Sequence, residues 1–456
     1  MNTGRKASAV TCEEARAERD SRGVSQGSRQ AGVMPQRLDT WGGVLEQAEG
    51  GSGSLAGRRA VAVVYSSYPG DPRPRRAAEA LAREGASVEV ICLKETDAEP
   101  ERETFNGVDI TRVNLKHRRG GKVFYIVQYG TFILLAAAIL AGRAFRRRYD
   151  LVHVHNMPDV LVFSALVPKL FGAKIILDLH DPMPELMMTI FRLREETLLV
   201  QLLKKFEAWS ILFADAVLTT NEAFKKLFVC RSCPAQKIEV IMNSPDEEIF
   251  QCHESEQSAS RESSNRFVIM YHGSLVERHG VDLAVSAIAQ TRERIPTAEL
   301  RLYGRCTPFL EQVLDWVRKS ELSDAIRYLG PMKLEQIPEA IRACDVGIIP
   351  NRRSAFTEIN MPTRIFEYLS QGKPVIAPQT AGIQDYFGPQ ELVFFELGNI
   401  DDLAVKMEYV FRHPAEVLEM AKRGQRVYRS HVWSGERTRF VNMVAGVLNR
   451  GKLSPA

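Results

Sequence analysis

Hydrophobic and polar positions alternate in blocks from residue 59 onward, and each block has the length of one strand or one helix. The run Ala60–Tyr65 is short and rich in β-branched residues, which is typical of a buried strand, and turn-forming residues follow it at 66–73. A helical segment then ends at Gly85, and a second β-branched run occupies Ala86–Leu93. Strand, loop, helix and strand in this order form a βαβ unit, which predicts a parallel sheet.

The same rhythm continues along the chain and divides into two series. The first adds predicted strands at 108–114, 151–155, 174–179, 216–219 and 238–242. The second has predicted strands at 267–271, 299–303, 326–329, 346–349 and 374–377, with helices at 281–292, 309–318, 334–343 and 362–371. We therefore expect an α/β protein with two Rossmann-like domains that face a central cleft, the place where open α/β folds bind ligands.

These series set the expected domain boundaries. Residues 1–58 show neither helical nor strand periodicity and lack the apolar core of a signal peptide, so we predict a disordered extension. We expect the N-terminal Rossmann-like domain at 59–245, a linker or surface loop at 246–265, and the C-terminal Rossmann-like domain at 266–430. The last segment, 431–456, is expected to form a helix that packs back on the N-terminal domain.

One segment, Val123–Gly142, carries no charge over twenty residues, which is long enough to cross a bilayer. A span would put the strands 108–114 and 151–155 on opposite sides of a membrane, although both are predicted in one sheet. We therefore favour a crossover helix buried in the domain, and a helix partly inserted at a membrane surface stays open. Basic residues on both sides would attract anionic lipid or would simply form a solvated face, namely Lys116, His117, Arg118, Arg119, Lys122, Arg143, Arg146, Arg147 and Arg148.

Composition excludes several classes of protein. The 60 basic and 56 acidic residues leave a net charge of only +4, so no nucleic-acid partner is expected. Seven cysteines in 456 residues do not form a disulfide framework, which favours a reducing compartment, the cytoplasm. The pair Cys230 and Cys233 has no matching second pair, so we expect no metal there.

Two segments of the second series carry phosphate-binding chemistry. The first, Tyr271–Gly280, lies between a strand and a helix, where the small residues Gly273 and Ser274 let the backbone approach a ligand. Arg278 adds a fork of donors suited to phosphate. An arginine that serves only solubility is the alternative.

In the second segment, 347–378, Pro362 suits the first turn of a helix. The N–H groups of Thr363 and Arg364 would then remain free for a phosphate. Glu367, one turn further, can accept two hydroxyls of a ribose. An amphipathic helix with surface Arg and Glu is the alternative interpretation of this segment.

From Val61 to about Phe440 the chain resembles the retaining glycosyltransferases of family four, which have the GT-B fold. The resemblance rests on seven segments in this order: YPGDPRPRRAAEALAREG, DLVHVHNMPD, ILDLHDPMPEL, VIMNSPDEEIF, YHGSLVERHGVDLAV, ACDVGIIPN and MPTRIFEYLSQGKPVIAP. Seven ordered segments are far more specific than any one of them.

The resemblance implies a donor site in the C-terminal domain. Glu367 matches the second glutamate of the E-x7-E motif, which holds the donor ribose, and the backbone of Thr363 and Arg364 matches positions that face the diphosphate. Arg278, with the backbone of Gly273 and Ser274, matches the loop that neutralises the leaving phosphates.

The N-terminal domain would hold the acceptor. There His180 matches a histidine beside the reacting sugar. Asp178 and Asp181, on either side of it in the sequence, would orient it or position the acceptor. Gly70 and Asp71 match the loop under the donor phosphates and the acceptor. His153 and His155, on strand 151–155, are predicted on opposite faces of the sheet, where packing is favoured and a place for one of them in the cleft is the alternative.

The sequence departs from the family pattern at three positions. The first glutamate of E-x7-E is expected at Ile359, yet the glutamate is Glu358, one residue early. Pro362 replaces the usual glycine, and His279 replaces the usual lysine of the first loop. No D-x-D triplet occurs, which is consistent with a reaction that needs no metal or other cofactor.

Together these features predict a retaining transfer of sugar from a nucleotide-sugar donor to an acceptor hydroxyl, in surface polysaccharide or glycolipid assembly. The apolar segment favours a lipid-linked acceptor and a peripheral position on the inner face of the cytoplasmic membrane. A sugar-nucleotide epimerase of the same fold, a phosphorylase-like enzyme with a pyridoxal lysine and a non-catalytic membrane-associated scaffold are the alternatives.

Overall fold

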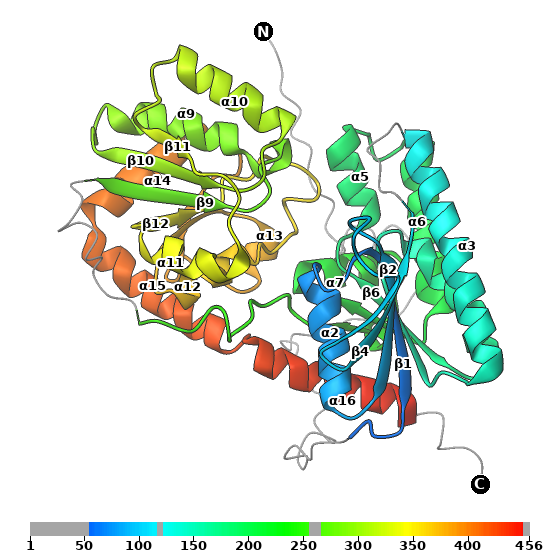
Figure 1. Ribbon diagram of the computed structural model, residues 1–456. Coiled ribbons are helices and arrows are strands. Elements are labelled where there is room, and N and C mark those ends of the chain that lie inside the picture. The colour runs from blue at the N-terminus through cyan, green and yellow to red at the C-terminus, as the bar shows by residue number, and fades with distance from the viewer. Residues whose placement is uncertain (1–53, 116–121, 255–265, 450–456) are drawn as a thin grey trace, which may run out of the picture. The chain divides into compact units, whose positions relative to one another are not determined.

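The computed structural model describes residues 54–115, 122–254 and 266–449, with only the backbone described at 122–126 (Figure 1). The predicted extension therefore lies outside the described residues as far as 53, as do much of the predicted linker and the basic residues at 116–119. Leu55 is buried, and its N–H donates to the carbonyl of Glu84. The packed chain thus begins before Arg59, the predicted start of the domain.

The first lobe is built on an eight-stranded sheet in the order β3-β4-β2-β1-β5-β6-β7-β8. Its neighbouring strands are parallel except β3, which runs antiparallel to β4 at the sheet edge. The sequence pattern did not predict β3, because its four residues are mostly exposed and polar. The strands are β1 (Arg59–Ser67), β2 (Ser87–Leu93), β3 (Arg102–Phe105), β4 (Val108–Val113), β5 (Leu151–His155), β6 (Lys174–Leu179), β7 (Ala216–Thr219) and β8 (Ile238–Val240).

Helices cover both faces of this sheet. Alternate residues of β1 point to opposite faces of the sheet. Ala60 and Ala62 pack with the layer of α2 (Pro72–Arg83). Val61 and Val63 pack with the layer that contains α3 (Lys122–Arg146). This double burial explains why β1 reads as a continuous apolar run. The other elements of the α3 layer are η1 (Asp159–Ala165), α4 (Leu166–Leu170), α5 (Met183–Phe191), α6 (Leu198–Phe213) and α7 (Glu222–Arg231), and the short η2 (Ala235–Lys237) precedes β8.

The second lobe has a six-stranded parallel sheet in the order β11-β10-β9-β12-β13-β14. Its strands are β9 (Phe267–His272), β10 (Ala298–Tyr303), β11 (Ile326–Tyr328), β12 (Val346–Ile348), β13 (Val375–Pro378) and β14 (Val393–Phe395). One hydrophobic cluster joins the sheet to α9 (Val281–Arg292), α10 (Pro308–Lys319) and α14 (Ile400–Arg412). A second cluster joins it to α11 (Ile337–Arg342), α12 (Arg364–Ser370), α13 (Ala381–Gln384) and the end of α15 (Pro414–Arg429), and η3 (Glu277–His279) and η4 (Leu334–Gln336) lie in the connections.

The last helix, α16 (Trp433–Asn449), returns to the first lobe and packs beside α2 (Figure 1). Its buried residue Phe440 lies with its ring centroid 5.5 Å from that of His153. Glu436, also buried, accepts a hydrogen bond from the N–H of Met242 at 2.9 Å. The α2 face of the first sheet is therefore completed by the far end of the chain.

Helix α3 has the length and apolar character of a membrane span by composition alone over Val127–Arg146. It nevertheless connects β4 to β5, two strands of one sheet, so it is the predicted crossover helix and does not span. Only one of its faces is buried, through Phe132, Ala136, Leu140 and Ala144. The expectation of a helix buried in the domain holds for that face alone.

We predict that Phe440→Ala lowers the free energy of unfolding by about 3–5 kcal/mol, because it leaves a cavity between α16 and the first sheet. Chemical denaturation followed by circular dichroism measures the change. Val405→Ala, at an exposed position of α14, is the control and should change the value by less than about 0.5 kcal/mol. Equal effects of the two substitutions would mean that α16 contributes little to the packing of the first lobe.

Candidate active site

His180 and Asp181 follow strand β6 directly, at the carboxyl end where α/β sheets bind ligands. The N–H of His180 donates to Asn156 Oδ1 at 2.8 Å, and its carbonyl accepts from Thr220 Oγ1 at 3.2 Å. Asn156 Nδ2 also donates to the carbonyl of Asp181 at 2.9 Å. Because Asn156 follows β5 and Thr220 follows β7, three neighbouring strands position this turn.

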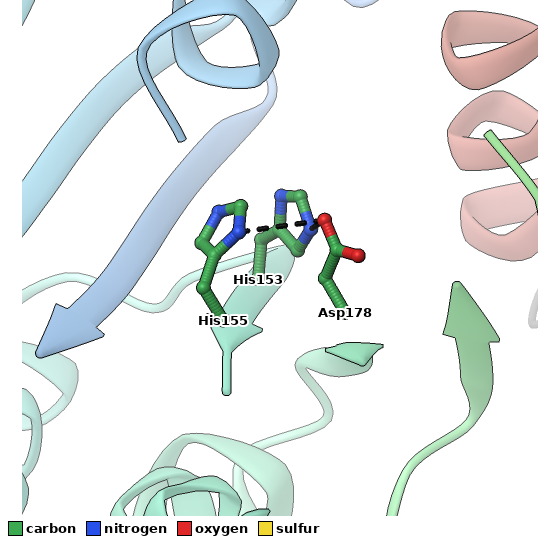
Figure 2. Close-up of side chains that lie close together, drawn as sticks. All are labelled: His153, His155 and Asp178. Carbon is green, nitrogen blue, oxygen red and sulfur yellow. Dashed lines mark ion pairs between the residues drawn. The ribbon is translucent and has the colours of Figure 1, made fainter. Parts of the chain in front are cut away.

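Two further histidines, His153 and His155, lie beside Asp178 (Figure 2). The rings of His153 and His155 are 4.1 Å apart, and Asp178 Oδ2 lies 3.6 Å from His153 Nε2 and 3.4 Å from His155 Nδ1. Our prediction that the two histidines face opposite sides of the sheet was wrong, because residues two apart on a strand share a face. Both are buried, and burial lowers the pKa of each.

The carboxylate of Asp178 forms a buried ion pair with Arg73 of α2. Arg73 Nη2 donates to Oδ1 at 2.7 Å and Nε donates to Oδ2 at 3.1 Å, while Nη1 donates to the carbonyl of Ile241 at 2.9 Å. Burial alone would raise the pKa of Asp178, but Arg73 and the histidines hold it well below its ordinary value. Asp178 is therefore charged at neutral pH, and α2 is fixed to the ends of β6 and β8.

His153, His155 and Asp178 also have donor atoms close enough together to hold a metal ion, all within 4.8 Å of one another. The bidentate contact with Arg73 uses both carboxylate oxygens and puts a positive charge beside the group. A divalent cation would have to displace that guanidinium or lie against it. The arrangement therefore suits a buried ion pair better than a metal centre.

The contact between His155 and His180 determines which nitrogen of His180 can serve a ligand. His155 Nδ1 lies 2.9 Å from His180 Nε2, so one of the two must carry the proton. We assign it to His155 Nδ1, because His155 Nε2 is buried with no partner among the described residues, and an orphaned N–H there would be costly. Nδ1–H is then the donor that His180 can offer outside this network.

In the second lobe, the loop after β9 lies tightly against the start of α12. Gly273 has a φ of +116°, which favours glycine, and a Cβ atom there would lie 2.3 Å from Arg364 Nη1 and displace that side chain. The Arg364 guanidinium also lies over the ring of Tyr271, 4.8 Å from its centroid. The predicted loop and the predicted helix start therefore form one site.

Arg278 and Arg364 both lie in this site. The Nε atoms of both are buried, with no hydrogen-bond partner among the residues that the structure describes. Burial, with the positive charge of Arg364, lowers the pKa of Arg278. Two arginines with unmet hydrogen-bonding capacity and mutual repulsion are the environment that an anionic ligand would stabilise.

Glu367 lies one turn into α12, with its side chain only 14% exposed. Its Oε2 atom is 3.3 Å from His272 Nε2, without the alignment of a hydrogen bond. Burial raises the pKa of Glu367 to about 7, although Arg364 and Arg76 oppose the rise. Burial lowers the pKa of His272 to about 3, so this histidine is neutral and leaves Glu367 available to a ligand.

Thr363 and Ser274 are placed differently from the arginines. Thr363 precedes α12, which begins at Arg364, and its hydroxyl is engaged with the backbone and side chain of Asn243 at 3.1 and 3.3 Å. Ser274 is exposed, and its carbonyl accepts from Tyr271 and from His279 Nδ1. Backbone groups, rather than the Thr363 hydroxyl, are what these positions can offer a phosphate.

Electrostatic contacts join the predicted residues of the two lobes. Burial raises the pKa of Asp181, while His180 and Arg278 lower it. Arg76 of α2 donates to the side chain of Asn243 and lies close enough to Glu367 to influence its pKa. Sequence reasoning missed Arg73 and Arg76, although both lie in the segment PGDPRPRR, because arginines at the start of an amphipathic helix usually face solvent.

The remaining predicted residues are not brought to the arginines. Glu358 forms an ion pair with Arg353 at 3.0 Å, and both side chains are exposed. Asp71 is the N-cap of α2, where it accepts hydrogen bonds from the N–H of Arg73 and the hydroxyl of Ser66. Gly70 is exposed beside it. Glu358 and Asp71 thus have structural partners of their own in the described chain.

Two parallel-sheet lobes of this kind are the architecture of the GT-B glycosyltransferases. Residues 71–244 match the glycosyl transferase 4-like domain, and residues 266–413 match the domain called glycosyl transferases group 1. The two matches together cover more than two thirds of the chain. The chain therefore belongs to glycosyltransferase family four and has the GT-B fold.

Individual relatives agree with this assignment. The probable glycosyltransferase WbjE of Pseudomonas aeruginosa is 22% identical over 252 residues, which are 54% of this chain and 60% of the relative. This chain spans less than two thirds of the length of the curated relatives that it matches first. Sucrose-phosphate synthase from Thermosynechococcus elongatus superimposes with a TM-score of 0.70 at 16% identity, over 86% of this chain and all of the other.

A structure of Anabaena HepE in complex with UDP-glucose superimposes with a TM-score of 0.63 at 15% identity, over 85% of this chain and 99% of HepE. At such identities the likeness concerns the fold. It confirms the predicted α/β class with two Rossmann-like domains.

We predict that Arg73→Ala lowers the free energy of unfolding by about 3–5 kcal/mol, because it leaves Asp178 charged, buried and unpaired. Arg318→Ala is the matched control, since Arg318 pairs with Asp315 on the exposed surface of α10, where such a pair contributes at most about 1 kcal/mol. Denaturant unfolding of both variants makes the comparison. If Arg73→Ala is as mild as Arg318→Ala, the ion pair does not organise the first lobe.

Proposed function

We propose that this glycosyltransferase moves a sugar from a nucleotide-sugar donor to an acceptor hydroxyl with retention of configuration. The observation that carries the proposal is the pair of arginines, Arg278 and Arg364, with buried and unpartnered Nε atoms beside the buried carboxylate of Glu367. Two cations suit a diphosphate, and a carboxylate suits the two hydroxyls of a ribose. A nucleotide sugar has both groups.

The proposed donor site lies in the second lobe. Arg278 and Arg364 neutralise the diphosphate, the backbone at Gly273, Ser274 and Thr363 lines it, and Glu367 accepts the ribose hydroxyls. HepE, whose structure carries UDP-glucose, supports a donor of this class. We propose that Glu358 contacts the donor sugar. Its ion pair with Arg353 would have to break before the Glu358 side chain could reach the sugar.

In the proposed reaction the bond between the anomeric carbon and the diphosphate oxygen breaks, and the electron pair leaves with the diphosphate. The acceptor oxygen bonds to the same face of the sugar, and its proton passes to the departing phosphate oxygen. Arg278 and Arg364 stabilise the developing charge, which is the task that a metal ion performs in other enzymes. We propose that no metal or other cofactor is needed.

His180 and Asp181 belong to the sugar and acceptor side of the proposed site. The assigned Nδ1–H of His180 would donate to a hydroxyl of the sugar or acceptor and position it, with the buried network of Asp178 and His155 holding the ring. Asp181, with Gly70 and Asp71 near the start of α2, would face the acceptor. We do not assign His180 as a general base.

We further propose that the acceptor is lipid-linked and that the reaction takes place at the inner face of the cytoplasmic membrane, in surface polysaccharide or glycolipid assembly. The exposed apolar face of α3 supports this location. A soluble acceptor is the alternative that an acceptor screen would detect.

The test is a thermal-shift screen of the protein against UDP-, GDP-, ADP- and dTDP-sugars. We expect one nucleotide class to raise the melting temperature, because a ligand that binds only the folded state stabilises it. Glu367→Ala and Arg278→Ala should abolish the shift, and Arg318→Ala should keep it. No shift with any donor, or an unchanged shift in both site variants, would remove the basis of the donor site.

A product assay without acceptor separates transfer from epimerisation. Incubation with the donor identified above should release at most a little free sugar and nucleotide. Accumulation of an epimeric nucleotide sugar would establish the epimerase instead.

Donor binding should depend on pH through Glu367. Its pKa of about 7 means that the carboxylate, the form that accepts the ribose hydroxyls, is lost as pH falls below 7. The Kd of the nucleotide sugar should therefore rise by about tenfold per pH unit between pH 7 and pH 5 and stay level above pH 8. Calorimetric titration measures this, and His272, with its pKa of about 3, does not titrate in that range.

Glu367→Gln is the control for the pH dependence, because the amide does not titrate. Its Kd should be weaker and level across the same range. A Glu367→Gln protein that keeps the full pH slope would assign the effect to another group.

A further inference from the structure

The outer face of α3 is exposed and apolar over its described length. Val127, Leu134, Ala138 and Phe145 form a stripe along this face, on the side opposite the residues that pack on the sheet, and Leu134 is 72% exposed. No charged residue occurs between Val127 and Gly142. A solvated crossover helix would carry polar residues on this side.

Helix α6 carries a second exposed stripe. Leu198, Leu202, Lys205, Trp209 and Leu212 follow one another at spacings of four and three residues, which puts them on one face of the helix. Leu198 is 86% exposed, Leu212 is 78% exposed and Trp209 is 53% exposed. All but one of these side chains are apolar.

Aromatic contacts join the two stripes through η1 and α4, since η1 packs against both α3 and α6. Phe145 of α3 lies 5.1 Å from Phe171, just after α4, and Phe163 of η1 lies 5.2 Å from Phe213 of α6. Leu166 and Leu170 of α4 are exposed between them. We call the exposed apolar residues of α3, α4 and α6 together the apolar face.

Positive charge borders the apolar face. Arg146, Arg147 and Arg148 are exposed at the end of α3, and none of them forms an ion pair with a carboxylate in the described part of the chain. Arg148 extends over the ring of Phe171, 5.7 Å from its centroid. Lys205 lies exposed within the α6 stripe. Among the acidic residues near this face, Asp215 is paired with Lys169 at 3.1 Å and Glu195, before α6, with Lys204 at 2.5 Å.

We infer that the apolar face docks the protein on an anionic lipid surface. Apolar side chains would enter the interfacial region of the bilayer, Trp209 would lie at the headgroup level, and the arginines would contact acidic headgroups. The unpaired arginines favour lipid over a second copy of this chain, which would bring the same positive charges together across a two-fold axis. Membrane docking would bring the protein to the proposed lipid-linked acceptor, and this biological role rests on the proposed function. The docking itself can be measured without activity.

The test is flotation of the full-length protein with vesicles in a density gradient. We expect the protein to float with vesicles of phosphatidylcholine and phosphatidylglycerol and to float far less with phosphatidylcholine alone. Leu134→Glu and Trp209→Glu should each reduce the floating fraction at least fivefold, since a carboxylate in the bilayer interface is costly. Arg146→Gln combined with Arg147→Gln should abolish the preference for the anionic vesicles.

Trp316→Glu and Val405→Glu are the matched controls, because Trp316 and Val405 are exposed apolar residues of α10 and α14 in the second lobe. Both should float like the unaltered protein, and all variants should keep the nucleotide-sugar thermal shift, which separates a docking defect from a failed donor site. Flotation that none of the apolar-face variants reduces, or no flotation even with the anionic vesicles, would overturn the inference. A dimer in light scattering that Leu134→Glu dissociates, without vesicle binding, would assign the face to a second copy instead.

Discussion

The first lobe depends on a charged carboxylate buried at the end of its central strands. Asp178 is tolerated there because Arg73 meets both of its oxygens, and the histidines beside it complete its surroundings. Arg73 also binds the carbonyl of Ile241, so a single guanidinium ties α2 to strands β6 and β8. The position of His180 follows from this arrangement, because its ring contacts His155 and its backbone is held by Asn156. The buried ion pair thus gives the proposed reaction a fixed histidine rather than a mobile one.

In the second lobe the charges of the candidate site are mainly positive. Its two arginines, Arg278 and Arg364, lie close enough for their charges to repel, and neither forms an ion pair with a carboxylate among the described residues. Glu367 lies nearby with a raised pKa, so the site as a whole favours an anion with hydroxyl groups. Two charged groups of the first lobe interact electrostatically with this site: Asp181 with Arg278, and Arg76 with Glu367. The proposed nucleotide-sugar donor would supply the phosphate charge and the hydroxyl groups that these residues can bind.

Most strand positions were predictable because buried parallel strands read as continuous β-branched runs, as at Ala60–Tyr65, although the short β14 was not predicted. Strand β3 was not predicted, because its residues are mostly polar and exposed at the edge of the sheet. In the candidate site, motif spacing identified Gly273, Arg278 and Glu367. It did not identify Arg73 and Arg76. Burial of an arginine depends on partners that are distant in sequence, such as Asp178 and Asn243. The shared face of His153 and His155 follows from strand geometry and was misjudged. The sequence could not predict that one side of α3 is exposed, because a helix that is apolar on all sides does not indicate which face its neighbours cover.

The most direct measurement of the central claim compares two donors that differ only in the ribose. Calorimetric titration would use the nucleotide sugar of the preferred base and its 2′,3′-dideoxy analogue, against the unaltered protein and Glu367→Ala. If Glu367 holds the ribose beside Arg278 and Arg364, the unaltered protein binds the dideoxy analogue at least tenfold more weakly, and Glu367→Ala binds the two donors equally. Equal affinities in the unaltered protein would contradict the donor site described here.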